Sequence, residues 1–148
     1  MEKNKIFNIM YGKEKKEIYD EFKIIEKSIE TSNDLYQYFD EFKNMLVNDK
    51  AYIKTRAFRI ICKMSYWDKD NKIDNNILKL LNVLDNNKPT NIRQCLIALQ
   101  TLIKNKPELL TIIKEHVQKI NYSRFKDTMS TLIKKDVDKL LNNIKLLS

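Results

Sequence analysis

Two stretches of the chain decide its fold: AYIKTRAFRIICKM at residues 51–64 and TNIRQCLIALQTLIK at residues 90–104. Both are long and apolar, and each has an apolar residue directly before a basic one near its start, Ile53-Lys54 and Ile92-Arg93. This dipeptide recurs after 39 residues, a period typical of helical hairpins stacked in an array. We therefore expect two equivalent helices in successive repeats, with the rest of the chain forming further helical layers.

The composition favours helices throughout. Only one glycine and two prolines occur among 148 residues, and 43% of the residues are apolar. Tight hairpins and phosphate-binding glycine loops are therefore nearly excluded, while the chain is long enough to bury a real core. We predict an all-α protein with one domain over residues 1–148, in which a helical cap over 1–30 precedes repeats over 31–148.

Apolar residues at helical spacing predict the individual elements. We expect helices over 3–10, 14–30, 35–47, 52–66, 74–84, 91–104, 107–120 and about 124–147. They pair as hairpins 34–47 with 51–66, 74–84 with 91–104, and 107–120 with 125–146. Thr90 or Asn91 is the expected N-cap of the helix after Pro89.

The charge is unevenly distributed along the chain. The net charge is +8, from 28 basic and 20 acidic residues. Residues 1–50 carry −2 and residues 51–148 carry +10, so the repeat-like part favours an anionic partner. Only four of the basic residues are arginines, and Lys, Asn and Ile are jointly abundant, which is also typical of A/T-rich coding bias.

Cysteine usage and hydropathy indicate a cytoplasmic protein. Cys62 and Cys95 lie within apolar helical segments, so we expect small buried thiols rather than a disulfide framework. The N-terminal residues have no apolar core long enough for a signal peptide, and no stretch approaches the length of a membrane span.

A basic stripe on the more apolar helix of each hairpin is the main candidate site. It comprises Arg56, Arg59, Lys63, Trp67, Arg93, Gln100, Lys104 and Lys134, with Lys135 beside the last. Stacked hairpins would bring these faces into register on the concave surface, where solenoid proteins bind their partners. Alternatively, the side chains are solvated or pair with acids at helix turns, and Arg56 bonds turn carbonyls between repeats.

The turn from Trp67 to Asp74 and the single histidine have simpler structural explanations. Asp70, Asn71 and Asp74 are explained by capping of the next helix, because a Ca²⁺ loop would need a glycine and a distal glutamate that are missing. Trp67 either fills the gap between hairpins or, if exposed, anchors a partner. We expect His116 to be packed or at an edge, no metal site, and no cofactor.

The segment Ile92-Arg93-x-x-Leu96-x-Ala98-Leu99 resembles the HEAT repeat, and Ile53-Lys54-x-x-Ala57 matches it in part. Residues 35–140 are similar to a family of short bacterial HEAT-repeat proteins. The shared motifs are Tyr38-Phe39, Lys54-Thr55-Arg56, Trp67-Asp68-x-x-Asn71-Lys72-Ile73-Asp74 and Lys88-Pro89-x-x-x-Arg93-Gln94-Cys95. Members often carry the name of an iron–sulfur assembly scaffold, whose chemistry belongs to a β-rich fold. The resemblance therefore implies a right-handed α-α superhelix of three to four hairpins, and no activity.

Together these features predict a non-enzymatic interaction module whose basic concave face binds an acidic protein segment. The alternative is binding of a nucleic-acid phosphate backbone through the same stripe. An enzyme is the least favoured class, because no nucleophile–base pair is evident. We expect a monomer or a weak homodimer, formed most plausibly through Leu140, Leu141, Ile144 and Leu147 near the C-terminus.

Overall fold

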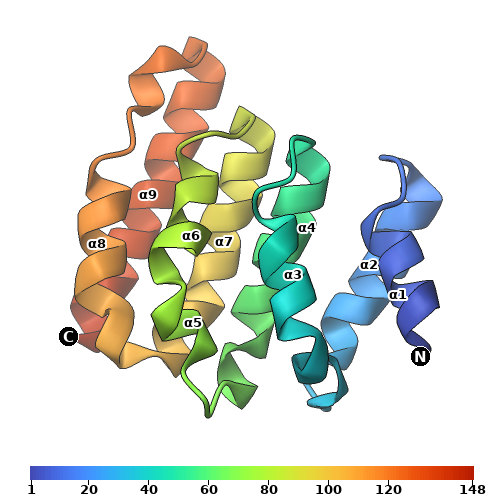
Figure 1. Ribbon diagram of the computed structural model, residues 1–148. Helices are drawn as coiled ribbons and strands as arrows, with labels where there is room; N and C mark the ends of the chain where they lie inside the picture. The colour runs from blue at the N-terminus through green and yellow to red at the C-terminus, as the bar shows by residue number, and fades with distance from the viewer.

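A computed structural model describes residues 1–148 and is helical throughout, without strands (Figure 1). The α-helices are α1 (Lys3–Met10), α2 (Lys16–Ser28), α3 (Phe39–Met45), α4 (Ala51–Met64), α5 (Lys72–Asn75), α6 (Ile77–Leu81), α7 (Pro89–Asn105), α8 (Leu110–Gln118) and α9 (Asp127–Leu147). Short 3₁₀ turns extend five of the connections: η1 (Asp34–Tyr38), η2 (Ser65–Trp67), η3 (Asn82–Leu84), η4 (Pro107–Leu109) and η5 (Tyr122–Arg124). The predicted all-α class is confirmed.

The helices form two layers (Figure 1). One layer holds α2, α4, α7 and α9, which have 13, 14, 17 and 21 residues, and we call it the long-helix layer. The other holds α1, α3, the α5–α6 pair and α8, none longer than nine residues. Contacts between α2 and α4, α4 and α7, and α7 and α9 join the long helices into a row. Because the chain alternates between layers, all four long helices run in the same direction.

Helix α7 lies at the centre of this row because its apolar residues face two neighbours at once. Ile92, Cys95, Leu96, Leu99 and Leu102 are all buried. The spacing of these residues repeats every three to four positions, so they line one broad stripe of the helix. They belong to one cluster of 39 buried apolar residues that extends from α1 to α9. The expected inward face of this helix is therefore confirmed.

The start of α7 differs from the expectation. The helix begins at Pro89, with Lys88 rather than Thr90 or Asn91 as its N-cap, and Lys88 makes no side-chain capping bond. Proline is favoured at the first helical position, because its φ is already helical and the amide it lacks would be unsatisfied there. The helix therefore starts before Thr90 and Asn91, the residues that N-cap preferences alone would select.

The helix expected over 74–84 is interrupted. The Asn76 backbone departs from helical geometry, with φ −123° and ψ 18°, and separates α5 from α6. Its side-chain Nδ2 donates to the Lys72 carbonyl at 2.7 Å, in the position that a helical backbone amide would take. Asparagine competes with the backbone for such bonds, which explains the break.

The expected apolar surface at the C-terminus is largely absent. Leu140 and Ile144 are buried against the rest of the chain, at 0% and 2% exposure, and only Leu146 and Leu147 are well exposed. Two of the four residues proposed for a dimer contact are therefore part of the monomer core. None of the helices combines the length and the apolar character that crossing a membrane requires.

Candidate binding surface on the long-helix layer

Arg56 ties the centre of α4 to the end of α1. Its Nη1 donates to the carbonyl oxygens of Ile9, Met10 and Gly12 at 3.3, 3.0 and 2.6 Å. These carbonyls lie at the end of α1 and in the turn after it, where Met10 and Gly12 have no intrahelical amide as a partner. The alternative role for Arg56, bonding turn carbonyls between hairpins, matches this geometry.

The next two cations on α4 also bond to the N-terminal hairpin. Arg59 donates from Nε and Nη2 to the Glu26 carboxylate, both at 2.8 Å, and from Nη1 to Gln94 Oε1 at 3.0 Å. Lys63 pairs with Glu30 at 2.9 Å. Arg59 therefore links α4 to α2 and to α7 at the same time, and its guanidinium N–H groups are mostly engaged within the chain.

Trp67 does not serve as an exposed anchor. It packs against the core, and its Nε1 donates to the Ile29 carbonyl at 2.7 Å. The exposed aromatic of this turn is instead Tyr66, which is 67% exposed and contacts the Trp67 ring edge to face. The gap-filling interpretation of Trp67 agrees with these contacts.

The stripe residues on α7 and α9 lie in a second set of contacts. Arg93 pairs with Asp136 at 2.7 Å, and Gln100 accepts a bond from Asn143 at 2.8 Å, so both join α7 to α9. Lys134 pairs with Asp138 along α9 itself. Lys104 is exposed and forms no ion pair.

The stripe residues therefore mainly join neighbouring helices to one another. Its first four residues hold the N-terminal hairpin to α4, and Arg93 and Gln100 hold α9 to α7. The structure brings Arg56, Arg59 and Lys63 together beside α2, and it places Arg93, Gln100, Lys104 and Lys134 in the separate α7–α9 region.

Arg56 nevertheless retains unused binding capacity. Its side chain is nine-tenths buried, all of its hydrogen bonds use Nη1, and no carboxylate of the chain forms an ion pair with it. Neither Nε nor Nη2 of Arg56 is fully enclosed without a partner, so both keep some accessible surface. Burial lowers the pKa of Arg56 from its ordinary value, although the guanidinium remains charged.

A cavity of about 340 Å³ lies in front of Arg56, and we call it the Arg56 pocket. Four cations line it, namely Lys15, Lys16, Arg56 and Arg59, against one acid, Glu14. The Arg56 guanidinium lies 4.9 Å from the centre of the Tyr52 ring, which forms part of the wall. Two of these cations are already paired, Lys16 with Asp20 and Arg59 with Glu26, so Lys15 and Arg56 are the pocket cations without an ion pair.

A second cavity of about 360 Å³ continues from the first along α4. The two share Tyr19, Arg59 and Gln94, and together they form what we call the inner groove, bounded by α2 and α7. Ile97 lines the second cavity and is 61% exposed, so the groove offers an apolar contact next to its charged end.

The turn after α4 encloses a buried ionic network. The Asp68 carboxylate accepts the Lys72 and Ile73 amides at 2.9 Å and the Tyr36 hydroxyl at 2.6 Å. Lys106, which is 4% exposed, lies 3.1 Å from Asp68 and 2.9 Å from Asp74. Asp68 rather than Asp70 is therefore the residue that caps α5, and this lysine is a partner that sequence reasoning missed.

The remaining reactive side chains are held within the fold. Cys62 and Cys95 are buried, as expected, and burial raises the pKa of Cys95 to about 12. His116 lies at an edge and contacts Asp85 at 2.9 Å. No group of three or more His, Cys, Asp and Glu side chains is arranged to hold a metal ion.

Sequence reasoning also missed Lys15, Lys16 and Tyr52 as pocket residues. The sequence does show a basic run, KEKK, directly after Gly12. Its helical spacing indicates only a solvent-exposed start of α2. Only the packing of α2 beside α4 brings that run close to Arg56.

Comparisons with known proteins give no match: no family model, curated protein or solved structure is significantly similar to this chain.

Proposed function

We propose that this protein is a non-enzymatic, cytoplasmic interaction module with a HEAT-like superhelical arrangement, and that it binds an acidic segment of a protein partner. The binding site in this proposal is the inner groove, with a carboxylate of the partner in the Arg56 pocket. The parallel row of long helices, backed by shorter ones, supports the HEAT-like arrangement (Figure 1).

The observation that carries the proposal is the state of Arg56. A buried cation is costly unless it is paired, and carbonyl dipoles compensate a full charge less well than a carboxylate does. Arg56 bonds only carbonyl oxygens, contacts the Tyr52 ring and lines the Arg56 pocket, while its Nε and Nη2 make no hydrogen bond within the chain. These two nitrogens have the fork geometry that binds a carboxylate through two parallel hydrogen bonds.

The rest of the groove supports a peptide rather than a small anion. Tyr19 and Ile97 are exposed along its length and offer apolar contacts beyond the charged pocket. Arg59, by contrast, is already bound to Glu26 on both of its fork nitrogens. We therefore assign carboxylate recognition to Arg56, with Lys15 and Lys16 at the pocket mouth, and a positioning role to Arg59.

The direct test follows the Nε–Hε resonance of Arg56 in ¹H–¹⁵N spectra. The chain has only four arginines, so single Arg→Lys variants assign the signals. A short peptide that alternates Glu and Leu should shift the Arg56 signal saturably, and the same peptide with Gln in place of Glu should not. The double variant Lys15→Gln/Lys16→Gln should weaken binding of the Glu peptide. The double variant Lys114→Gln/Lys139→Gln, which removes the same charge elsewhere on the protein, should leave that binding unchanged.

Two results would reject the proposal. One is an Arg56 signal that does not move with any concentration of the Glu peptide. The other is equal binding of the Glu and Gln peptides, which would mean that the groove recognises apolar side chains without a carboxylate.

A further inference from the structure

The positive charge of the protein is concentrated on one edge. The four long helices all begin at this edge, which lies at the top of Figure 1, and we call it the N-edge. Its turns cover residues 11–15, 46–50, 82–88 and 119–126, with seven basic and three acidic residues. The turns of the opposite edge, residues 29–38, 65–71 and 106–109, have two basic and five acidic residues. The fold thus separates charge that the sequence scatters along the chain.

Lysine is the N-cap of every long helix. Lys15, Lys50, Lys88 and Lys126 precede α2, α4, α7 and α9, and none makes a side-chain capping bond. Ser, Thr, Asp and Asn are the favoured N-caps, and a cation near the positive end of the helix dipole is destabilising. Departures from such local rules are expected at functional sites rather than at random positions.

Coding bias does not explain this placement. Lysine accounts for 24 of the 148 residues, about one in six, so composition alone predicts fewer than one lysine among four N-caps. The same bias would also act equally on both edges, and the opposite edge has more acids than bases.

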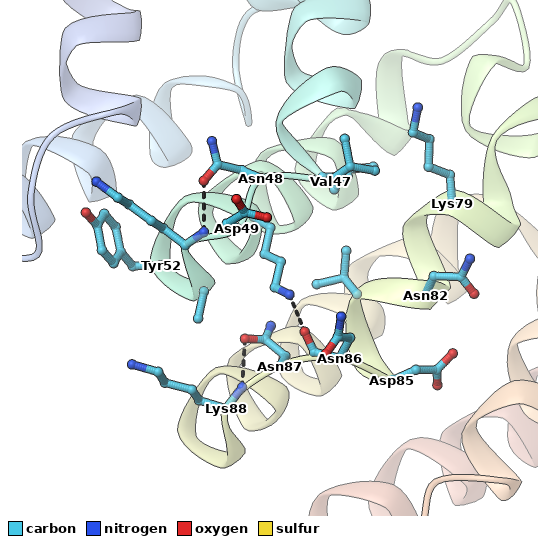
Figure 2. Close-up of a pocket in the computed structure, with 15 residues that line it drawn as sticks. Val47, Asn48, Asp49, Tyr52, Lys79, Asn82, Asp85, Asn86, Asn87 and Lys88 are labelled. Atoms are coloured by element: carbon cyan, nitrogen blue, oxygen red, sulfur yellow. Dashed lines mark hydrogen bonds between the residues drawn. The ribbon is translucent and has the colours of Figure 1, made fainter.

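A groove crosses the N-edge between the starts of α4 and α7 (Figure 2). It has a volume of about 760 Å³ and is lined by the turns before both helices. Lys50, Lys79 and Lys88 line it without forming ion pairs, whereas Lys54 donates to the Asn86 carbonyl and ties the two turns together. One of its two acids, Asp85, contacts His116.

We propose that the N-edge binds the phosphate backbone of a nucleic acid, with Lys50, Lys79 and Lys88 in the groove as its central contacts. Packed helices lie about 8–10 Å apart, so the starts of four long helices form an edge roughly 25–30 Å long. That length approaches one turn of B-form DNA, roughly 34 Å, and DNA carries one negative charge per about 1.7 Å.

The side chains of the N-edge fit a polymer of phosphates better than an acidic peptide. The contacts are separate lysine point charges, which suit phosphates that are not read base by base. Val47 is the exposed apolar side chain of the groove, so few contacts are available to anchor a peptide. Tyr11, which is 51% exposed, lies in the turn before α2, where an aromatic ring can stack on an unpaired base.

The test compares two charge-matched triple variants of the full chain. Lys50→Gln/Lys79→Gln/Lys88→Gln removes the groove lysines, and Lys69→Gln/Lys104→Gln/Lys145→Gln removes three exposed lysines from the opposite half. Binding of labelled single-stranded and double-stranded oligonucleotides is measured by fluorescence anisotropy over a series of salt concentrations. Thermal melting checks the fold, and the groove triple should melt no lower than the unmodified protein.

We expect the groove triple to bind about tenfold more weakly or worse, with the slope of log K against log salt reduced by about one per lysine removed. The opposite triple should bind nearly as well as the unmodified protein. The two oligonucleotide forms show whether the backbone alone or unpaired bases also contribute.

Three outcomes would overturn the proposal. These are no oligonucleotide binding at low salt, equal losses in both triples, and binding lost in Arg56→Lys but not in the groove triple. Polyglutamate that binds the N-edge as tightly as an oligonucleotide, with the same loss in the groove triple, would identify an acidic protein as the partner instead. The proposal does not depend on the inner groove, because the Glu–Leu peptide should bind the groove triple unchanged.

Discussion

At the scale of single residues, Arg56 and Lys106 show two ways of burying a cation. Lys106 lies among Asp68, Asp74 and Asn71, so its charge is neutralised within the chain. Arg56 bonds backbone carbonyls, contacts the Tyr52 ring and lines a cavity, without a carboxylate partner. Lys106 therefore serves stability alone, whereas Arg56 can both support the fold and bind an anion.

The Asp68–Lys106 pair predicts a specific dependence of stability on pH. Burial alone would raise the pKa of Asp68, but hydrogen bonds from Tyr36, the Ile73 amide and Lys106 lower it below its ordinary value of 3.8. A group whose pKa is lowered by folding stabilises the protein above its unfolded pKa. That stability is therefore complete above about pH 3.8 and is lost as pH falls through the lower folded-state pKa.

Asp68→Asn should lower the free energy of unfolding by roughly 3 kcal/mol at neutral pH, because it leaves Lys106 buried with a weaker partner. It should also flatten the loss of stability below pH 3.8. Urea denaturation over a pH series measures both effects. Asp70→Asn is the matched control, since Asp70 is exposed and forms no ion pair; an equal loss in the control would contradict the assignment.

At the scale of elements, the start of α7 combines a favourable proline with an unfavourable lysine. Pro89 positions the helix, and Lys88 at the N-cap has the extended backbone geometry in which a short polar side chain would cap it, with φ −76° and ψ 150°. The helix therefore forgoes the stabilisation that an ordinary N-cap would provide.

Lys88→Asp should raise the free energy of unfolding by about 1 kcal/mol, because the carboxylate accepts a first-turn amide and interacts favourably with the helix dipole. Lys104→Asp makes the same change of charge in the last turn of α7 and should destabilise the protein. Thermal and urea denaturation of both variants measure the difference. If both changes shift stability in the same direction, net charge rather than helix polarity is responsible. Lys88→Asp should also weaken oligonucleotide binding, which links the missing cap to function.

At the scale of the whole molecule, the N-terminal hairpin is held differently from the rest. The α4–α7 and α7–α9 interfaces are extensive, whereas α1 and α2 contact α4 over a smaller interface. Their buried side chains belong to the common core, and Arg56, Arg59, Lys63 and Trp67 add polar bonds across this junction. Such a unit is expected to open at a lower free energy than the core of the array.

Native-state hydrogen exchange should therefore show lower protection in α1 and α2 than in α4 and α7. Glu26→Gln, which breaks the paired bonds to Arg59, should lower protection in α1 and α2 by about 1 kcal/mol and leave α8 and α9 unchanged. A uniform fall across all helices would show that the chain opens as one cooperative unit and that the hairpin is not separately held.

The sequence predicted the helices well and the site only partly. Helices over 3–10, 14–30 and 107–120, and the pairing of α3 with α4 and of α8 with α9, follow from local apolar spacing and are confirmed. The stripe was found as a set of residues, but its partners were not. Glu26, Asp136 and Asn143 lie 33 to 43 positions away from the residues they bind, and nothing local marks them.

The sequence by itself determined the all-helical class, the approximate extent of most helices and their buried faces, because helix periodicity acts over a few residues. Only the tertiary structure decided which charged side chains pair with one another and which remain free to bind a partner. The row of long helices brought Glu26 to Arg59, left Arg56 facing a cavity, and gathered the lysines of distant turns on one edge. Electrostatic interactions act through space between segments far apart in the chain, so their partners are set by the packing of helices and not by local sequence.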